Sequence, residues 1–213
     1  MKPFRAFLSK QLGSPSGWFG RLLLRLLNRN NAAMNNLVLQ EIQLQSGERV
    51  LEIGFGGGDL IHRIVKTGLS SLIVGIERSP DALKICQRRF QPFIRQGKIE
   101  LHLADAATLP FPDHYFSQVC TVNTLYFWPD APQVFAEAHR VLNLGGKLLV
   151  GYASKAYLDQ QKFSQHGFAT YDVSEVEMMV EMAGFASIST VSGQSNHHQE
   201  FFCTSGIAVS SKK

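Results

Sequence analysis

Residues 50–58 read Val-Leu-Glu-Ile-Gly-Phe-Gly-Gly-Gly, and this stretch decides the fold. Its first apolar residues favour a buried strand, and its glycines supply the open backbone dihedrals that let a ligand lie against the main chain. Apolar residues at helical spacing follow directly, so the glycines form a strand-to-helix turn. Glu77 closes the next apolar run, 19 positions after Gly58, where its carboxylate can accept hydrogen bonds from a ribose. Together these features predict a nucleotide site.

The spacing of the glycines distinguishes two kinds of nucleotide site. A dinucleotide site has the pattern G-x-G-x-x-G, whereas this turn reads Glu52-x-Gly54-x-Gly56-x-Gly58. That pattern resembles motif I of the class I S-adenosylmethionine (SAM)-dependent methyltransferases. Later motifs of that family match in order and spacing: Leu103-Ala-Asp105-Ala106, Leu109-Pro-Phe-Pro-Asp113, residues 116–122 and Glu137-Ala-His-Arg-Val-Leu142-x-x-Gly145-Gly146. The resemblance covers about residues 37–155 and is greatest to the quinone-biosynthesis C-methyltransferases and related small-molecule enzymes.

Length and composition suit one α/β domain with short appendages. The chain has 213 residues, of which 45% are hydrophobic and 18% charged. No apolar run reaches the ~20 residues needed to span a bilayer, no signal peptide is evident, and the three cysteines lack metal-ligand spacing. We therefore expect a cytoplasmic protein without a metal site. The net charge of +4 arises from residues 1–40, which hold six basic residues and no acid.

Strand and helix patterns alternate from residue 46 onward. The predicted strands are residues 49–54, 72–77, 98–103, 116–122, 146–152, 186–191 and 200–209. The predicted helices are residues 58–67, 80–91, 131–141 and 173–183. Helix-linked strands imply a parallel sheet, and the last two strands, without a helix between them, imply an antiparallel hairpin. The resemblance implies a Rossmann-like seven-stranded sheet in the order 3-2-1-4-5-7-6, with the last strand antiparallel and helices on both faces.

We divide the chain into a basic helical arm, residues 1–45, and a methyltransferase domain, residues 46–213. Within the arm, one helix is predicted over residues 18–28, with arginines at every fourth position, and another over residues 36–45. Three functions of the first helix stay open. It can close over the site as a lid, as appended helices do in this family; residues 17–29 can contact a membrane surface; or the helix can simply pack on the domain.

The resemblance assigns roles around the predicted crevice. The glycine turn would line the methionine part of SAM, with Glu52 below it orienting the amino end through water. Glu77 would hold the ribose hydroxyls, and Asp105 would accept a hydrogen bond from the adenine amino group. The predicted cofactor-binding residues are Glu52, Gly54, Gly56, Gly58, Glu77, Arg78, Asp105, Ala106 and Asn123.

Other functions of the same residues stay open on the sequence alone. Gly56 or Gly58 can serve only close packing between helix and strand, and Asp105 can simply cap a turn. Arg78 stands where an arginine would meet the 2′-phosphate of a dinucleotide, which keeps an NADP-dependent oxidoreductase as an alternative. The glycine spacing and the lack of an evident Tyr-x-x-x-Lys pair speak against that alternative.

The resemblance places the acceptor pocket after the fourth strand, where aromatic residues gather. The predicted substrate-binding residues are Thr124, Tyr126, Trp128 and Tyr152. Tyr126 and Trp128 each pair an apolar ring with a polar group, which suits a planar or lipidic acceptor. The candidates for a catalytic base are Tyr126 and His166. His102 and His139 fit structural or surface positions better.

The sequence therefore predicts methyl transfer from SAM to a small organic acceptor by direct in-line displacement, which leaves S-adenosylhomocysteine. We expect no nucleic-acid partner, because Asn123-Thr-Leu-Tyr126 keeps only the ends of the Asn/Asp-Pro-Pro-Tyr signature of nucleic-acid amino methyltransferases. A non-catalytic SAM-fold module that docks on a membrane or a partner is a further alternative. The sequence indicates no oligomeric state.

Overall fold

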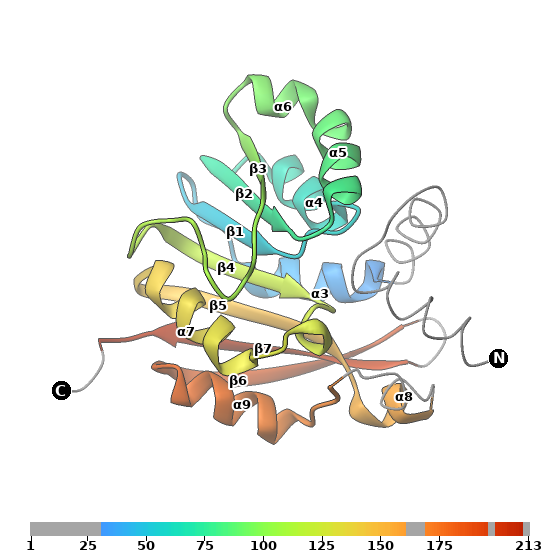
Figure 1. The fold of residues 1–213 in the computed structure, drawn as a ribbon. Coiled ribbons are helices and arrows are strands. Elements are labelled where there is room, and N and C mark those ends of the chain that lie inside the picture. Colours follow the sequence, from blue (N-terminus) through green and yellow to red (C-terminus); the bar gives the residue numbers. More distant parts are fainter. Residues whose placement is uncertain (1–30, 161–168, 196–198, 211–213) are drawn as a thin grey trace.

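A seven-stranded sheet forms the centre of the computed structural model, which describes residues 31–160, 169–195 and 199–210 (Figure 1). The strands are β1 (Arg49–Ile53), β2 (Leu72–Glu77), β3 (Ile99–Leu103), β4 (Phe116–Val122), β5 (Leu142–Ala153), β6 (Phe185–Gln194) and β7 (Glu200–Ala208). Their order is β3-β2-β1-β4-β5-β7-β6. β7 runs antiparallel to both of its neighbours, while the pairs from β3 to β5 are parallel. The predicted fold class and strand order are confirmed.

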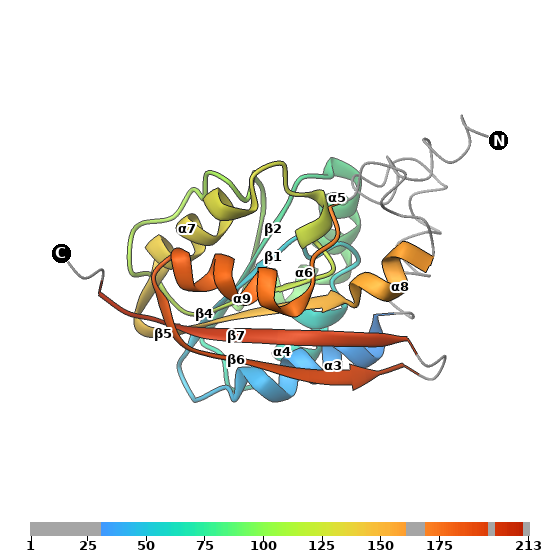
Figure 2. The ribbon, with the colours of Figure 1, turned by 90° about the horizontal axis from the view of Figure 1, so that it is seen from below.

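The central strands are buried because helices cover both faces of the sheet. α3 (Ala32–Ile42) and α4 (Asp59–Thr67) lie on one face, and α7 (Ala131–Val141) and α9 (Val173–Met182) lie on the other (Figure 2). A strand covered on both faces reads as an almost continuous apolar run, as β1 and β2 do. The remaining described helices are α5 (Pro80–Arg89), α6 (Gln91–Arg95), the 3₁₀ helix η1 (Leu125–Phe127) and α8 (Lys155–Gln160).

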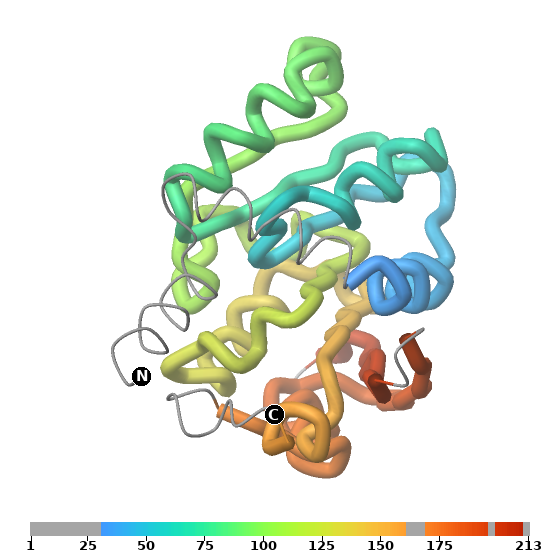
Figure 3. The backbone as a smooth tube through the Cα atoms, turned by 90° about the vertical axis from the view of Figure 1, so that its right-hand side faces the viewer, coloured from blue at the N-terminus to red at the C-terminus, as the bar shows by residue number. Residues whose placement is uncertain are grey.

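The position of the site follows from the strand order. The chain runs from β1 outward to β3 and then returns to β4 on the other side of β1. Ligands bind beyond the carboxyl ends of parallel strands at such a reversal, because the connections on the two sides diverge there. In Figure 3 the segments on the two sides of β1 lie at opposite ends of the molecule: the green segment around α5 at one end and the orange segment around α9 at the other.

The start of α5 has a capping residue and a proline, both of which favour a helix N-terminus. Ser79 accepts a hydrogen bond from the Ala82 amide (3.2 Å), and Pro80 occupies the first turn of α5. The predicted helix over residues 80–91 divides at Phe90, however, and α6 begins after it. The cause is Pro92, which has no amide hydrogen to continue the helical ladder.

The helix before β1 differs from its prediction. It spans Ala32–Ile42 rather than residues 36–45, and it ends where Gln43 adopts a left-handed conformation. Its asparagines do not break it, because Asn35 is buried against α4. The predicted helix over residues 18–28 lies outside the described residues, and the boundary at residue 45 stays a prediction. Across the described ranges, no helix is long and apolar enough to cross a membrane.

Candidate active site

A cavity of about 620 Å³ opens at the carboxyl ends of the central strands. It brings together most of the predicted site residues, which line it from four different strand ends: Glu52, Gly54, Gly56, Glu77, Arg78, Asp105, Ala106, Asn123, Thr124, Tyr126 and Trp128. Two predicted residues, Gly58 and Tyr152, do not line this cavity. The structure therefore gathers most of the predicted residues around one cavity and places those two outside its lining, and their predicted roles in binding stay predictions.

Close neighbours leave no room for a side chain at two glycines of the turn, Gly54 and Gly58. Gly54 has a φ of +72°, and a Cβ there would lie 2.4 Å from Cγ2 of Thr124, so only glycine fits under the end of β4. Gly58, at the other end of the turn, does not line the cavity. A Cβ at Gly58 would lie 2.6 Å from the Phe90 ring, so this glycine allows α5 to pack closely on the start of α4. The sequence offered packing between helix and strand as an alternative function for Gly58, and the contact in the structure is between two helices.

Glu77 holds the turn in place through its carboxylate. Oε1 accepts hydrogen bonds from the amides of Arg78 (2.8 Å) and Ser79 (2.9 Å), and Oε2 accepts one from the Gly56 amide (3.0 Å). Burial raises the pKa of this carboxyl, and the three amide bonds act in the opposite direction. A carboxylate has about four acceptor positions, so one remains for a ribose hydroxyl without any change to the turn.

Glu52 lies beneath the turn and is almost completely buried, with 3% of its surface exposed. Its Oε2 has no hydrogen-bond partner among the described residues, although the side chain lines the cavity. Burial raises the pKa of this carboxyl to about 8, and the nearby acids Asp59 and Glu77 add to the shift. A buried acceptor of this kind favours a donor or a cation from a ligand.

Asp105 and Ala106 form the rim of the cavity after β3. Oδ1 of Asp105 accepts a hydrogen bond from the Ala107 amide (2.9 Å), so the predicted turn-capping function is present. Asp105 is exposed and lines the cavity, so its carboxylate keeps acceptor positions for a donor from a ligand. The capping and ligand-binding functions are therefore compatible.

The end of β4 carries a chain of neutral hydrogen bonds. Asn123 has a φ of +56°, and its side-chain amide donates to Oδ1 of Asn31 (2.8 Å). The Tyr126 hydroxyl donates to Oδ1 of Asn123 (3.1 Å) and accepts a hydrogen bond from the Ala153 amide. Burial raises the pKa of Tyr126 far above its ordinary value. A hydroxyl that stays protonated and is engaged with the main chain is a poor general base.

The aromatic side of the cavity differs from its prediction at one position. Trp128 lines the cavity together with Phe127 and Tyr157. Tyr152 is fully buried in the sheet, where its hydroxyl contacts Oγ1 of Thr204 (2.8 Å). Successive residues of a strand point to opposite faces, so Ala153 faces the cavity and Tyr152 cannot.

The described histidines lie away from the cavity. Nδ1 of His114 contacts the Leu142 carbonyl (2.8 Å), and Nε2 of His139 contacts the Val209 carbonyl (3.0 Å). His102 lies at the edge strand β3. His166 lies outside the described residues, so its predicted function as a base stays a prediction.

Four polar residues of the site went unrecognised in the sequence, one of them Asp59 at the first turn of α4. Asn31 and Asn35 line the cavity from the start of α3, and Gln199 lines it from the start of β7. Nδ2 of Asn35 donates to Oδ2 of Asp59 at the first turn of α4 (2.9 Å). The sequence signal was the asparagine cluster itself, which is costly to bury unless each amide has a partner.

The residues around the cavity fit SAM. Four acidic residues line the cavity, Glu52, Asp59, Glu77 and Asp105, and SAM carries positive charges on its sulfonium and amino groups. The buried Oε2 of Glu52, which has no partner among the described residues, is consistent with a polar ligand or water at this end of the cavity, because a buried polar atom without a partner is costly.

Comparison with known proteins agrees with this geometry. Residues 51–150 match the family model described as a methyltransferase domain. The chain carries a class I SAM-dependent methyltransferase domain. SAM is accordingly the cofactor of this methyltransferase domain, and no described residue or comparison favours the oxidoreductase or non-catalytic alternatives.

The relatives of the domain are distant. The uncharacterized methyltransferase YdaC of Bacillus subtilis is 27% identical over 128 residues, which cover 59% of this chain and 67% of that protein. The demethylmenaquinone methyltransferase of Symbiobacterium thermophilum is 27% identical over 132 residues, which cover 62% of this chain and 51% of that protein. The chain spans between 30% and 67% of the length of such curated relatives.

A solved structure shares the fold over most of its length. The SAM-dependent methyltransferase from Aquifex aeolicus has a TM-score of 0.71 and 17% sequence identity, and the match covers 87% of this chain and 97% of that one. The fold of this chain is therefore shared with a solved SAM-dependent methyltransferase over nearly the whole of that protein.

Proposed function

We propose that this protein transfers the methyl group of SAM to a small organic acceptor by direct in-line displacement. The observation that carries the proposal is one cavity with two chemically different halves. Acids at the ends of β1 and β2 form one half, and aromatic and amide side chains form the other. When bound, SAM supplies an electrophilic methyl group, and the acceptor atom forms its new bond to carbon as the bond from carbon to sulfur breaks.

The domain supports this reaction mainly by orientation. Glu77 fixes the glycine turn and keeps one acceptor position for the ribose, while Glu52 lies beneath the turn, where it can orient the amino end through water. A chain of side-chain hydrogen bonds joins Asn31, Asn123 and Tyr126, and it limits where an acceptor can lie. Holding two reactants in line accounts for a large part of the rate of such a transfer.

The acceptor half of the cavity favours an uncharged, planar or apolar molecule. Among the described residues it contains Phe127, Trp128, Tyr157 and Leu158, with Asn31 and Gln199 as its polar groups. A charged acceptor would lose its hydration there without gaining a counter-ion from these side chains. A relative named as a demethylmenaquinone methyltransferase is consistent with such an acceptor.

Two further parts of the proposal concern location. Cys86, Cys120 and Cys203 are free and buried, which supports a reducing compartment such as the cytoplasm. The proposal also keeps two functions for residues 17–29: contact with a membrane surface, or closure over the site as a lid. Those residues lie outside the described ranges. Sedimentation with anionic liposomes, with and without residues 1–30, tests the membrane contact, which is wrong if the truncation changes nothing.

The direct test of the function is a transfer assay. The protein is incubated with SAM that carries an isotope-labelled methyl group and with a cell metabolite extract, and labelled products are sought by mass spectrometry. We expect label in an apolar small molecule and an equal amount of S-adenosylhomocysteine. Label in nucleic acid or protein only would contradict the proposal.

A further inference from the structure

Helix α7 binds the loop that follows β3 through three polar side chains on one face. Gln133, Glu137 and Arg140 are spaced by four and three residues, so they form a single row along the helix. The row faces residues 104–115, which connect β3 to β4 without regular secondary structure. This loop begins with Asp105 and Ala106 at the rim of the cavity.

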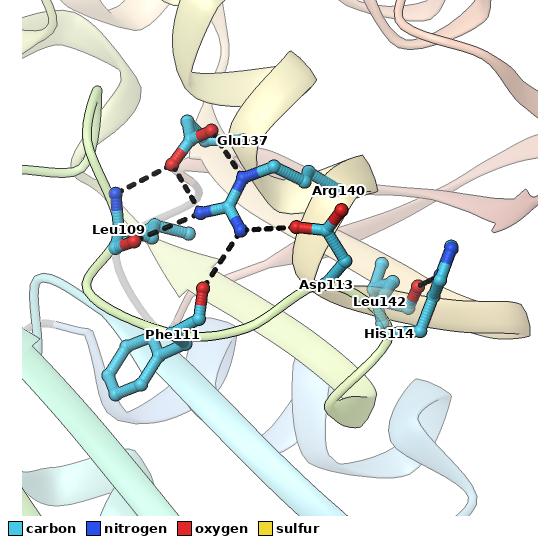
Figure 4. A network of polar contacts seen from close by, with 7 residues as sticks. All are labelled: Leu109, Phe111, Asp113, His114, Glu137, Arg140 and Leu142. Atoms are coloured by element: carbon cyan, nitrogen blue, oxygen red, sulfur yellow. Dashed lines mark hydrogen bonds and ion pairs between the residues drawn. The ribbon is translucent and has the colours of Figure 1, made fainter.

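Arg140 uses all of its hydrogen-bond donors in this contact, as Figure 4 shows. Nε and Nη2 donate to the two carboxylate oxygens of Glu137 at 2.7 and 2.8 Å. Nη2 also donates to the Leu109 carbonyl (2.9 Å), and Nη1 donates to the Phe111 carbonyl and to Oδ1 of Asp113, each at 2.8 Å. A guanidinium has five N–H groups, and each has one partner here.

Glu137 completes the attachment from the same helix. Its Oε2 accepts a hydrogen bond from the Leu109 amide (2.7 Å), and the hydrogen bonds from Arg140 are the main reason that its pKa is lowered. Gln133 donates to the Ala107 carbonyl (3.3 Å). The helix therefore holds the main chain of the loop at three alternate residues, 107, 109 and 111.

The loop depends on these contacts because its own main chain has few amide hydrogens with which to form hydrogen bonds. Pro110 and Pro112 have no amide hydrogen, and the apolar anchor Leu109 is 5% exposed. The attachment at residue 107 is also adjacent to the amide that Asp105 caps. A shift of the loop would therefore move the Asp105 carboxylate and the Ala106 amide together.

We propose that Arg140 and Glu137 are positioning residues that set the affinity for the adenine end of SAM by holding the loop of residues 105–111. The inference rests on the proposed function, since it takes Asp105 and Ala106 as the contacts of the adenine. Neither Arg140 nor Glu137 lines the cavity, so the effect passes through the main chain of the loop.

The test compares cofactor affinity with stability in four variants. Arg140→Ala and Glu137→Ala remove the attachment, and Arg140→Lys keeps the charge but cannot reach two carbonyls and a carboxylate at once. Val180→Ala, at a fully buried position of α9, is the matched control, since it lowers stability at a distance from the loop. Titration calorimetry measures the Kd for SAM and for 5′-methylthioadenosine, which lacks the amino-acid end, under conditions where unfolding curves show every variant folded.

We expect both Arg140 variants and Glu137→Ala to raise the two Kd values by the same factor, about tenfold for the alanine variants. Hydrogen exchange at residues 105–109 should become faster, and Val180→Ala should bind both ligands like the wild type. Unchanged Kd values in folded Arg140→Lys and Glu137→Ala would overturn the inference, as would an equal loss in Val180→Ala. If the wild type itself does not bind SAM, the cofactor assignment fails instead.

Discussion

Substitution of Glu52 by glutamine should change how the stability of the protein depends on pH. Burial raises the pKa of this carboxyl from 4.5 to about 8. Between these values the folded protein keeps the proton on Glu52, whereas the unfolded chain releases it. The unfolded state therefore binds fewer protons, and the free energy of unfolding falls as pH rises through this window.

The size of the effect follows from the same shift. The difference between 4.5 and about 8 corresponds to at most about 5 kcal/mol of stability lost by the alkaline end of the window, since one pKa unit is about 1.4 kcal/mol. Glutamine has the shape of the protonated acid but cannot ionise. Glu52→Gln should therefore lose less stability than the wild type as pH rises.

The assay is urea unfolding of both proteins at steps between about pH 5 and about pH 9. Glu181→Gln, the same change at an exposed position of α9, serves as the matched control and should follow the wild type. The informative quantity is the difference between the two curves, because the other titrating groups contribute equally to both. Parallel curves for Glu52→Gln and wild type would refute the conclusion that this carboxyl is held neutral.

Further predictions concern the turn and the aromatic wall. Gly58→Ala should lower the free energy of unfolding by about 1–3 kcal/mol more than Gly47→Ala, because both have a positive φ but only Gly58 faces a ring, 2.6 Å from the new Cβ; equal losses in urea unfolding would contradict this. Tyr126→Phe should cost about 1–2 kcal/mol, since the Ala153 amide loses its acceptor. The pH–rate profile of that variant should keep the shape of the wild type, and loss of an ionisation from the profile would identify Tyr126 as a base.

The sequence predicted the parts of the site that depend on local pattern. A strand, a glycine turn, a helix and an acid at the end of the next strand are all local features, and strand order places their ends together. Glu52, Gly54 and Glu77 could be found in this way. The function of Gly58 could not, because it depends on Phe90, which packs against it only after α5 has folded back.

The remaining differences also come from tertiary contacts. Asn31 bonds to Asn123, which is 92 positions away along the chain, so the local cluster of asparagines does not by itself place Asn31 at the site. Tyr152 was misplaced by one residue, which in a strand reverses the face, and Ala153 lines the cavity in its place. Aromatic composition alone does not determine which side of a strand a ring occupies.

The central claim is that the cavity at the ends of β1, β2 and β4 binds SAM. The most direct measurement is titration calorimetry of the purified protein with SAM, S-adenosylhomocysteine and NADPH, repeated with Asp105→Ala at the exposed rim of the cavity. We predict saturable binding of SAM and S-adenosylhomocysteine at one site, affinity reduced about tenfold or more in Asp105→Ala, and no binding of NADPH. A folded sample that fails to bind SAM, or that binds NADPH tightly in its place, would contradict the claim.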